Sequence, residues 1–216
     1  MVEVKFCGII HPRDAVTAVE LGARYVGMIF ASSPRQVTPE QGRDIVAALR
    51  AADVATVGVF DDIGQDEILA IAEGVGLDCV QLHAWSDPEM IGVLRSRFDG
   101  DVWAVSRVGP GGLDSRAGQL FGVADGVLLD TQSAKGLGGS GTIFDWPAVA
   151  GAVATVRGQA RLIVAGGLRA ENVCRAVEAL DPDVVDVSSG VEHSPGIKDP
   201  QRMRAFVAAV RACVPR

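Results

Sequence analysis

The sequence predicts a single-domain α/β fold, a (β/α)8 TIM barrel with eight parallel strands. Eight short apolar runs recur roughly every 26 residues, and a stretch of helical pattern follows each one. Runs such as 162–165 are apolar on both faces, which is typical of a parallel sheet covered by helices. At 216 residues and 48% apolar, the chain can bury one large core, so we expect residues 1–216 to form one domain. An open doubly wound sheet is the alternative, but eight units in this length favour a closed barrel.

The elements follow from the pattern in chain order. The expected strands are residues 2–7, 24–30, 54–60, 78–83, 101–105, 126–130, 161–165 and 184–188. Helices are expected between them, for example over 40–50 and 66–73, where apolar residues fall on one stripe. Two helix starts are marked by a capping side chain before a proline, at Thr38-Pro39 and Asp87-Pro88.

Charge and composition exclude several classes of protein. The net charge is −7, so the chain has no basic character with which to bind nucleic acid or an anionic membrane. No stretch is long and apolar enough for a membrane helix, and the N-terminus lacks the pattern of a signal peptide. We therefore expect a cytoplasmic protein. Sequence cannot locate exposed apolar patches, and our working expectation for assembly is a monomer or weak homodimer.

Four cysteines are scattered along the chain without CxxC spacing. This spacing speaks against a zinc site or a disulfide scaffold, so we expect no metal and a reduced compartment. Cys79, Cys174 and Cys213 are expected to be inert small hydrophobes. Cys7 differs from them because it ends the first expected strand.

Cys7 and Asp130 are the candidate catalytic residues, because each ends an expected strand. In a TIM barrel the chemistry lies at the C-terminal ends of the strands. A strand-terminal Asp is also a common cap, and an apolar-flanked Cys is usually inert, so position alone does not decide their role. Lys5 precedes Cys7 by two residues and points to the same face of the strand, where its charge could favour the thiolate.

Glycine-rich stretches follow the last three expected strands. They are residues 136–142, the pair Gly166-Gly167, and Ser188-Ser189-Gly190. Glycine lets backbone N–H groups approach a ligand closely, and barrels often hold a phosphate at the loops after strands seven and eight. A single Gly pair often serves only a turn, but two such loops on adjacent strands predict a phosphate site.

Seven motifs in this order resemble the phosphoribosylanthranilate isomerases of tryptophan biosynthesis. They are Lys5-Phe6-Cys7-Gly8-Ile9, Ser33-Pro34-Arg35, Val80-Gln81-Leu82-His83, Leu128-Leu129-Asp130-Thr131, Gly138-Gly139-Ser140-Gly141 with Phe144-Asp145-Trp146, Ala165-Gly166-Gly167-Leu168, and Asp186-Val187-Ser188-Ser189-Gly190-Val191-Glu192. The resemblance spans the whole chain. It implies a (β/α)8 barrel that needs no cofactor and converts a small phosphosugar, an aminoaldose, to an aminoketose by an Amadori rearrangement.

The resemblance also implies residue roles. Asp130 would be the general acid that opens the ribose ring, and Cys7 the general base. Arg35 would hold the anthranilate carboxylate, since a guanidinium binds carboxylate bidentately. Gln81 and His83 would line the substrate site, and Asp186 would face the sugar hydroxyls. The loop before Arg35 is one residue shorter than is usual in the family, which bears on its reach.

Several other functions were weighed. The related isomerase of histidine biosynthesis carries, by family pattern, an aspartate where Cys7 stands, and it needs a second phosphate loop that segment 59–62 does not supply. A ribulose-phosphate epimerase would need metal-ligand histidines, and an indole-glycerol-phosphate synthase a pair of strand-end lysines. A barrel that binds a phosphosugar without turning it over is the non-enzymatic alternative, and an activity assay separates it.

Overall fold

Eight parallel strands form a closed barrel in the computed structural model, which describes residues 1–83, 86–131 and 143–213. The barrel strands are β1 (Glu3–Phe6), β2 (Tyr25–Ile29), β3 (Ala55–Phe60), β4 (Cys79–Leu82), β5 (Asp101–Gly109), β7 (Gly126–Thr131), β8 (Arg161–Val164) and β9 (Val184–Val187). They are hydrogen-bonded in the order β4-β3-β2-β1-β9-β8-β7-β5, and pairing of β4 with β5 closes the ring. The predicted fold class is confirmed.

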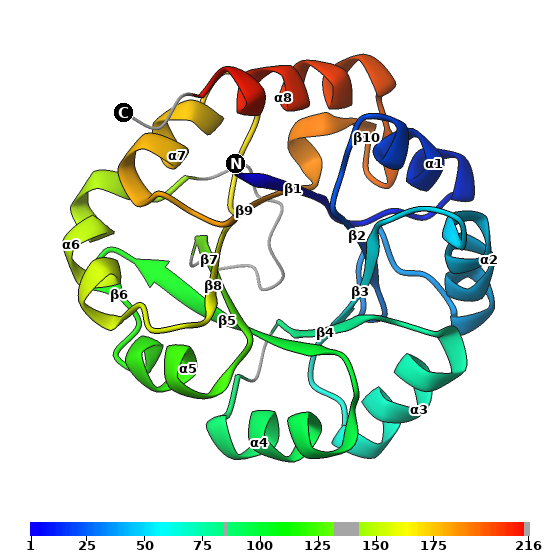
Figure 1. Cartoon of the computed structure of the whole chain (residues 1–216), viewed down its shortest axis with the longest axis horizontal. Helices are drawn as coiled ribbons and strands as arrows, with labels where there is room; N and C mark the ends of the chain where they lie inside the picture. Colours follow the sequence, from blue (N-terminus) through cyan, green and yellow to red (C-terminus); the bar gives the residue numbers. More distant parts are fainter. Residues whose placement is uncertain (84–85, 132–142, 214–216) are drawn as a thin grey trace.

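Helices surround the barrel as an outer ring (Figure 1). They are α1 (Pro12–Glu20), α2 (Pro39–Leu49), α3 (Gln65–Val75), α4 (Pro88–Arg97), α5 (Ala117–Val123), α6 (Trp146–Val156), α7 (Val173–Leu180) and α8 (Pro200–Ala212). The predicted cap at Thr38 is a complete capping box with Gln41. Asp87 precedes α4 as expected, but its side chain makes no capping hydrogen bond.

Three short strands and one 3₁₀ turn were not predicted. Strand β6 (Gly112–Leu113) pairs with the end of β5, which runs four residues beyond its predicted end at residue 105. The 3₁₀ turn η1 (Ser189–Val191) leads into a hairpin of β10 (Glu192–Ser194) and β11 (Ile197–Lys198). These pieces are too short to give a period-2 pattern, so the sequence did not indicate them.

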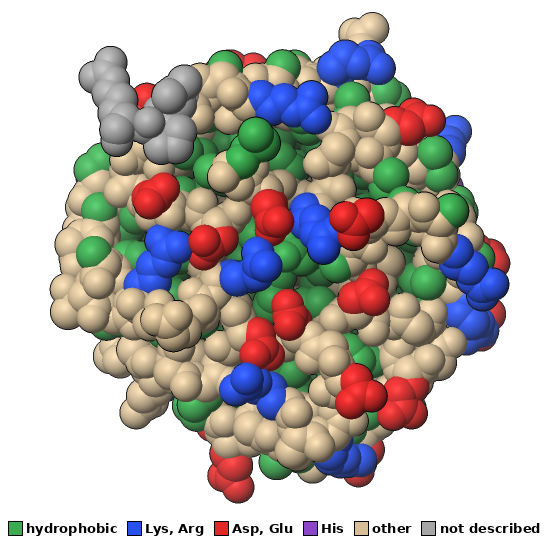
Figure 2. Space-filling view, viewed as in Figure 1, with side chains coloured by type: hydrophobic (Ala, Val, Ile, Leu, Met, Phe, Trp, Pro, Cys, Tyr) green, Lys and Arg blue, Asp and Glu red, His purple; other side chains and the backbone are tan. Residues whose placement is uncertain are grey.

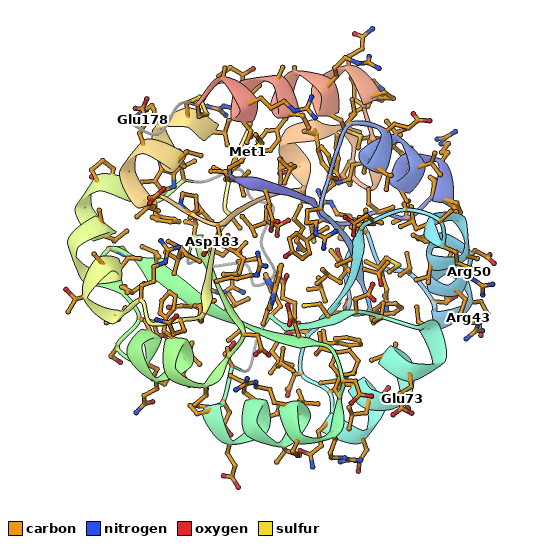
Figure 3. All side chains as sticks on the ribbon, in the orientation of Figure 1. Met1, Arg43, Arg50, Glu73, Glu178 and Asp183 are labelled. Carbon is orange, nitrogen blue, oxygen red and sulfur yellow. A yellow bond between two sulfur atoms is a disulfide. The ribbon has the colours of Figure 1, made fainter. Side chains whose placement is uncertain are left out.

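The core has two layers separated by the barrel wall. The larger cluster packs strand side chains such as Phe6, Val80 and Leu129 against the helices. A second cluster, which includes Val57, Trp103 and Leu128, fills the barrel interior toward the strand N-termini. Alternate residues of each strand face these two layers, as the two-residue period of a strand requires. Figure 3 shows side chains filling both layers, with Arg43, Arg50 and Glu73 on the outer rim.

Ion pairs gather where the strands begin. Arg161 donates to Glu3 at 2.9 Å, Arg157 lies 2.8 Å from Asp183, and Arg95 lies 2.8 Å from Asp125. Acidic and basic side chains alternate near the centre of the face in Figure 2. In TIM barrels this N-terminal face serves stability, whereas the opposite face carries the chemistry. Among the described residues, no helix is long and apolar enough to cross a membrane.

The expectation for Cys174 and Cys213 is wrong. These two cysteines form a disulfide that joins α7 to the residue after α8, with their Cα atoms 5.2 Å apart. They are 39 residues apart in sequence, and only the packing of α7 beside α8 brings them together. Cys7 and Cys79 are free and buried. The cysteine spacing spoke only against a disulfide scaffold, and a single disulfide is not such a scaffold.

Candidate active site

A single cavity at the C-terminal ends of the strands collects most of the predicted site residues. It encloses about 670 Å³, including open solvent at its mouth. Its lining includes ten of the predicted residues, namely Cys7, Arg35, Gln81, His83, Asp130, Gly166, Gly167, Asp186, Ser188 and Ser189. These residues come from loops or strand ends spread around the barrel, so the parallel topology is what unites them.

Gly190 is the predicted residue that the cavity does not include. A Cβ at this position would collide with the carbonyl oxygen of Leu168, so the glycine allows two loops to touch. Its requirement is thus explained by packing behind the cavity. The predicted glycine run 136–142 lies outside the described residues.

Cys7 lies just after β1, with its side chain in the barrel interior. Gly27 on the neighbouring strand leaves room for it, since a Cβ there would come within 3.0 Å of the Cys7 sulfur. Burial raises the pKa of the Cys7 thiol, and the charge of Lys5 opposes this by lowering it. Lys5 therefore has the influence that its spacing predicted, but burial is the larger effect.

Lys5 is completely buried below the cavity, and Asp186 is its partner. Its ammonium donates to Asp186 Oδ2 at 2.9 Å, across the register that pairs the two residues on β1 and β9. Burial alone would lower the pKa of Lys5, but Asp186 and Cys7 more than offset this and raise it. A charged Lys5 is therefore stable beneath the thiol.

Asp130 lies near the end of β7, with both carboxyl oxygens bonded. Oδ1 accepts the Thr131 backbone N–H at 2.8 Å, and Oδ2 accepts Arg107 Nη1 at 2.6 Å. Burial raises the pKa of Asp130 above its usual value, whereas Arg107 and the Thr131 amide oppose this rise. Burial and hydrogen bonding thus shift the pKa of the candidate acid in opposite directions.

His83 lies at the end of β4, with its Nε2 3.9 Å from Asp130 Oδ2. Burial lowers the pKa of His83 to about 3, and the charge of Arg107 adds to this effect. The imidazole is therefore neutral at physiological pH and offers hydrogen bonding rather than charge.

Arg35 reaches the cavity from the loop after β2, and Glu192 fixes its orientation. Arg35 Nε and Nη2 donate to the two Glu192 oxygens at 2.8 and 2.7 Å. Lys198 donates to the same carboxylate at 2.8 Å, and also to the carbonyl oxygens of Cys7 and Ser188. Burial alone would raise the pKa of Glu192, but Arg35 and Lys198 bring it below its usual value.

The sequence interpretation missed Arg107 and Lys198. Arg107 follows Val105 by two residues, so a longer β5 would have placed it on the inward face with the same period. Lys198 lies in a two-residue strand that carries no recognisable pattern. Glu192 was quoted in a motif, but not as part of the site.

Three buried polar atoms of the cavity lack a hydrogen-bond partner within the described ranges. They are Gln81 Oε1, Asp186 Oδ1 and Ser188 Oγ. Unpaired buried polar atoms are costly, so their convergence indicates a cavity built for a polar ligand. Among the described residues, no group of three or more side chains is arranged to hold a metal ion.

The barrel and its cavity define the class: a (β/α)8-barrel enzyme with its site at the C-terminal face. The family described as N-(5'-phosphoribosyl)anthranilate (PRA) isomerase matches residues 4–209. The isomerase of that name from Halorhodospira halophila is 42% identical over 208 residues, covering 96% of this chain and 95% of its own length.

Solved structures agree with this match. The phosphoribosylanthranilate isomerase of Thermotoga maritima superposes with a TM-score of 0.87 at 35% identity, covering 98% of this chain and 99% of that one. A further structure of such an isomerase, in complex with reduced 1-(o-carboxyphenylamino)-1-deoxyribulose 5-phosphate, has a TM-score of 0.84 at 34% identity with the same coverage. The chain belongs to the phosphoribosylanthranilate isomerase family, whose reaction is the isomerisation of phosphoribosylanthranilate in tryptophan biosynthesis.

Proposed function

We propose that this chain performs its family's isomerisation without a cofactor, by general acid and base catalysis from Asp130 and Cys7. The observation that carries the proposal is that one cavity holds both groups together with the unpartnered oxygens of Gln81, Asp186 and Ser188. A sugar phosphate supplies the hydroxyls and anionic oxygens that such atoms need. The polarity of the cavity and the presence of both candidate groups in its lining therefore support the proposal.

The proposed chemistry needs one proton given and one taken. Asp130 donates a proton to the ribose ring oxygen, so the C–O bond breaks and an iminium forms between the anomeric carbon and the amine nitrogen. Cys7, as thiolate, removes the proton from the adjacent carbon, and the electron pair neutralises the iminium to give an enolamine. Tautomerisation of the enolamine then yields the aminoketose.

The two ends of the substrate are assigned to different loops. The phosphate is assigned to the Gly166-Gly167 and Ser188-Ser189-Gly190 loops. Gly166 and Gly167 have φ values of 83° and 65°, which favour glycine. At Gly166 a Cβ would come within 2.6 Å of Thr131 Oγ1, so only glycine keeps this loop close to β7. Arg35 is assigned to the anthranilate carboxylate. Its Nη1 is the terminal nitrogen that Glu192 does not engage.

The chemistry of the substrate indicates the cellular compartment that we propose for the enzyme. A phosphorylated intermediate of amino-acid synthesis is made and used inside the cell, so we propose a cytoplasmic enzyme. A monomer or weak homodimer remains the proposed assembly, with the small phosphosugar as partner and neither nucleic acid nor membrane involved.

The decisive experiment follows the loss of anthranilate fluorescence when the protein is added to phosphoribosylanthranilate. The aminoaldose substrate of histidine biosynthesis is tested in parallel. Turnover of the first substrate supports the proposal, and turnover of the second alone contradicts it.

Variants then test the acid and the base. A single positioned acid or base contributes about 10²–10⁴-fold, so Asp130→Asn and Cys7→Ala should each lose at least that much activity. Cys79→Ala is the matched control, because Cys79 is also buried in the barrel but does not line the cavity. If Asp130→Asn kept a tenth of wild-type turnover, Asp130 would not be the acid.

A further inference from the structure

Lys198 is a buried cation that does not line the cavity but is bonded to residues that do. Its side chain is completely buried. Its Nζ donates to the carbonyl oxygen of Cys7 at 2.6 Å, to that of Ser188 at 3.2 Å and to Glu192 Oε1 at 2.8 Å. An ammonium group has three N–H donors that diverge from one atom, and these acceptors match all of them. Lys198 therefore joins the end of β1, the loop after β9 and the partner of Arg35 at one point.

The bond to Ser188 determines how the next backbone N–H is directed. A peptide group is planar and trans, so the carbonyl oxygen of Ser188 and the N–H of Ser189 point in opposite directions. Lys198 and the Val191 N–H both donate to this carbonyl oxygen, the latter at 3.4 Å. Ser189 itself lines the cavity. Its N–H is therefore turned away from Lys198, as a backbone donor to an anion in the cavity must be.

The bond to Cys7 acts on the candidate base in a similar way. Gly8, the next residue, has a φ of 70°, so the chain turns sharply where β1 ends. A Cβ at Gly8 would come within 2.5 Å of Arg35 Cδ and 3.0 Å of Ser188 Oγ, so this turn is packed closely against both residues. Lys198 holds the Cys7 carbonyl within the same turn. Because the carbonyl and the side chain of Cys7 share one Cα, a shift of the carbonyl would move the sulfur.

We propose that Lys198 is a positioning residue that fixes the phosphate-binding loop and the base relative to each other. One ammonium group holds a carbonyl of each, so the separation of the Ser189 N–H from the Cys7 sulfur depends on this side chain. Glu192 supplies the counter-charge, which opposes the lowering of the Lys198 pKa by burial. Rates depend steeply on such distances, because a displacement of about 1 Å can cost roughly 10²-fold. The inference rests on the proposed phosphate site and on Cys7 as the base.

The partner of Lys198 offers a comparison that separates positioning from stability. Lys198 and Glu192 form one buried ion pair, so the loss of either charge disturbs the same network. Lys198 holds the two carbonyls, however, whereas Glu192 orients Arg35. We therefore expect Lys198→Met to affect the phosphate end of the substrate and Glu192→Gln to affect the carboxylate end.

The test measures inhibition of phosphoribosylanthranilate turnover by inorganic phosphate, after circular dichroism has shown that each variant is folded. In Lys198→Met the inhibition constant of phosphate should rise about tenfold, the effect of misdirecting one hydrogen bond to a charged group. The kcat should fall roughly 10²-fold. In Glu192→Gln the Michaelis constant should rise, while the inhibition constant of phosphate stays near that of the wild type. Arg202→Met is the matched control, because Arg202 donates to the backbone carbonyl of Glu192 from a half-exposed position, and it should behave as the wild type.

A double variant tests the link to the base. If Lys198 acts through Cys7, adding Lys198→Met to Cys7→Ala should lower kcat little further, because the base that it positions is already absent. A general loss of structure would multiply the two effects instead. Lys198→Arg covers the case in which Lys198→Met does not fold. It keeps the charge that Glu192 needs, but the donors of a guanidinium lie in one plane, so phosphate inhibition should still weaken.

The proposal is overturned if folded Lys198→Met, or Lys198→Arg in its place, keeps the wild-type inhibition constant of phosphate. It is also overturned if Glu192→Gln weakens phosphate inhibition equally, or if the losses in the double variant multiply. Failure of the proposed function looks different: the wild type would neither turn over phosphoribosylanthranilate nor bind inorganic phosphate in a calorimetric titration. An active wild type that phosphate inhibits, with a Lys198→Met variant that phosphate inhibits as strongly, would contradict only the positioning role.

Discussion

Replacement of Glu192 by glutamine should be among the most damaging conservative changes near the cavity. Glu192 is 5% exposed and accepts hydrogen bonds from Arg35 and Lys198. Glutamine keeps the size of the side chain but removes its charge, so two buried cations lose their counter-charge. Removing one partner of a buried ion pair typically costs 3–5 kcal/mol. Lys198 keeps its bonds to two backbone carbonyls, which places the expected loss of unfolding free energy near the lower figure, about 3 kcal/mol.

Thermal and chemical unfolding monitored by circular dichroism measure this loss. In a chain of this length each kcal/mol shifts the Tm by about 2–4 °C, so a drop of roughly 6–12 °C is expected. The matched control is Glu171→Gln, whose carboxylate is 76% exposed and lies 3.6 Å from Arg169. Such an exposed pair contributes about 0–1 kcal/mol. If the two variants lost similar amounts of stability, the view of Glu192 as the centre of a buried charge network would be wrong.

The Glu192→Gln variant should also change how the stability of the protein depends on pH. The pKa of Glu192 is depressed in the folded protein, so its contribution is present above the usual pKa of a glutamate and is lost as the pH falls through the folded value. Wild-type stability should therefore fall on acidification below about pH 4.5, and part of that fall should be absent from Glu192→Gln. The Michaelis constant should also rise in the variant, because Arg35 loses the group that orients it.

Three other outcomes are expected. Iodoacetamide should inactivate the oxidised protein through Cys7, with protection by substrate, because Cys174 and Cys213 are bonded to each other; inactivation that persists in Cys7→Ser would contradict this. Reduction should cost about 3–4 kcal/mol of stability, as the loop of 39 residues is no longer closed, and Cys174→Ser should show no further response to reductant. Gly167→Val should weaken inhibition by inorganic phosphate, since its φ is +65° and a side chain crowds the loop, whereas Arg35→Met should mainly raise the Michaelis constant; the reverse pattern would mean that the substrate lies the other way round.

The sequence predicted the barrel because its pattern is local. Each strand is a short apolar run, and such a run can be recognised from its own residues and spacing, without knowledge of any distant contact. The same argument located Cys7 and Asp130, because the end of a strand is visible in sequence and the topology sends all such ends to one face. The ends of the strands were predicted less accurately than their positions. The predicted end of β5 at residue 105 stopped short of Arg107, and with it the partner of the acid.

Contacts between distant segments were not predictable in this way. The disulfide joins positions that only helix packing brings together, and Lys198 reaches the Cys7 carbonyl from 191 residues away. Gly190 shows a related difficulty, because a glycine that packs against the Leu168 carbonyl looks the same in sequence as one that only contacts a ligand. Local pattern identifies where chemistry can occur, but not which neighbours set its charge.

Charge at the mouth explains how an acidic protein can receive an anionic substrate. The chain carries a net charge of −7, so its overall field opposes the approach of a phosphate and a carboxylate. Among the described residues around and beneath the cavity, however, four side-chain cations pair with three carboxylates: Lys5, Arg35, Arg107 and Lys198 with Asp130, Asp186 and Glu192. Each of these three carboxylates is paired with at least one of the cations, which reduces its repulsion of the anionic ligand.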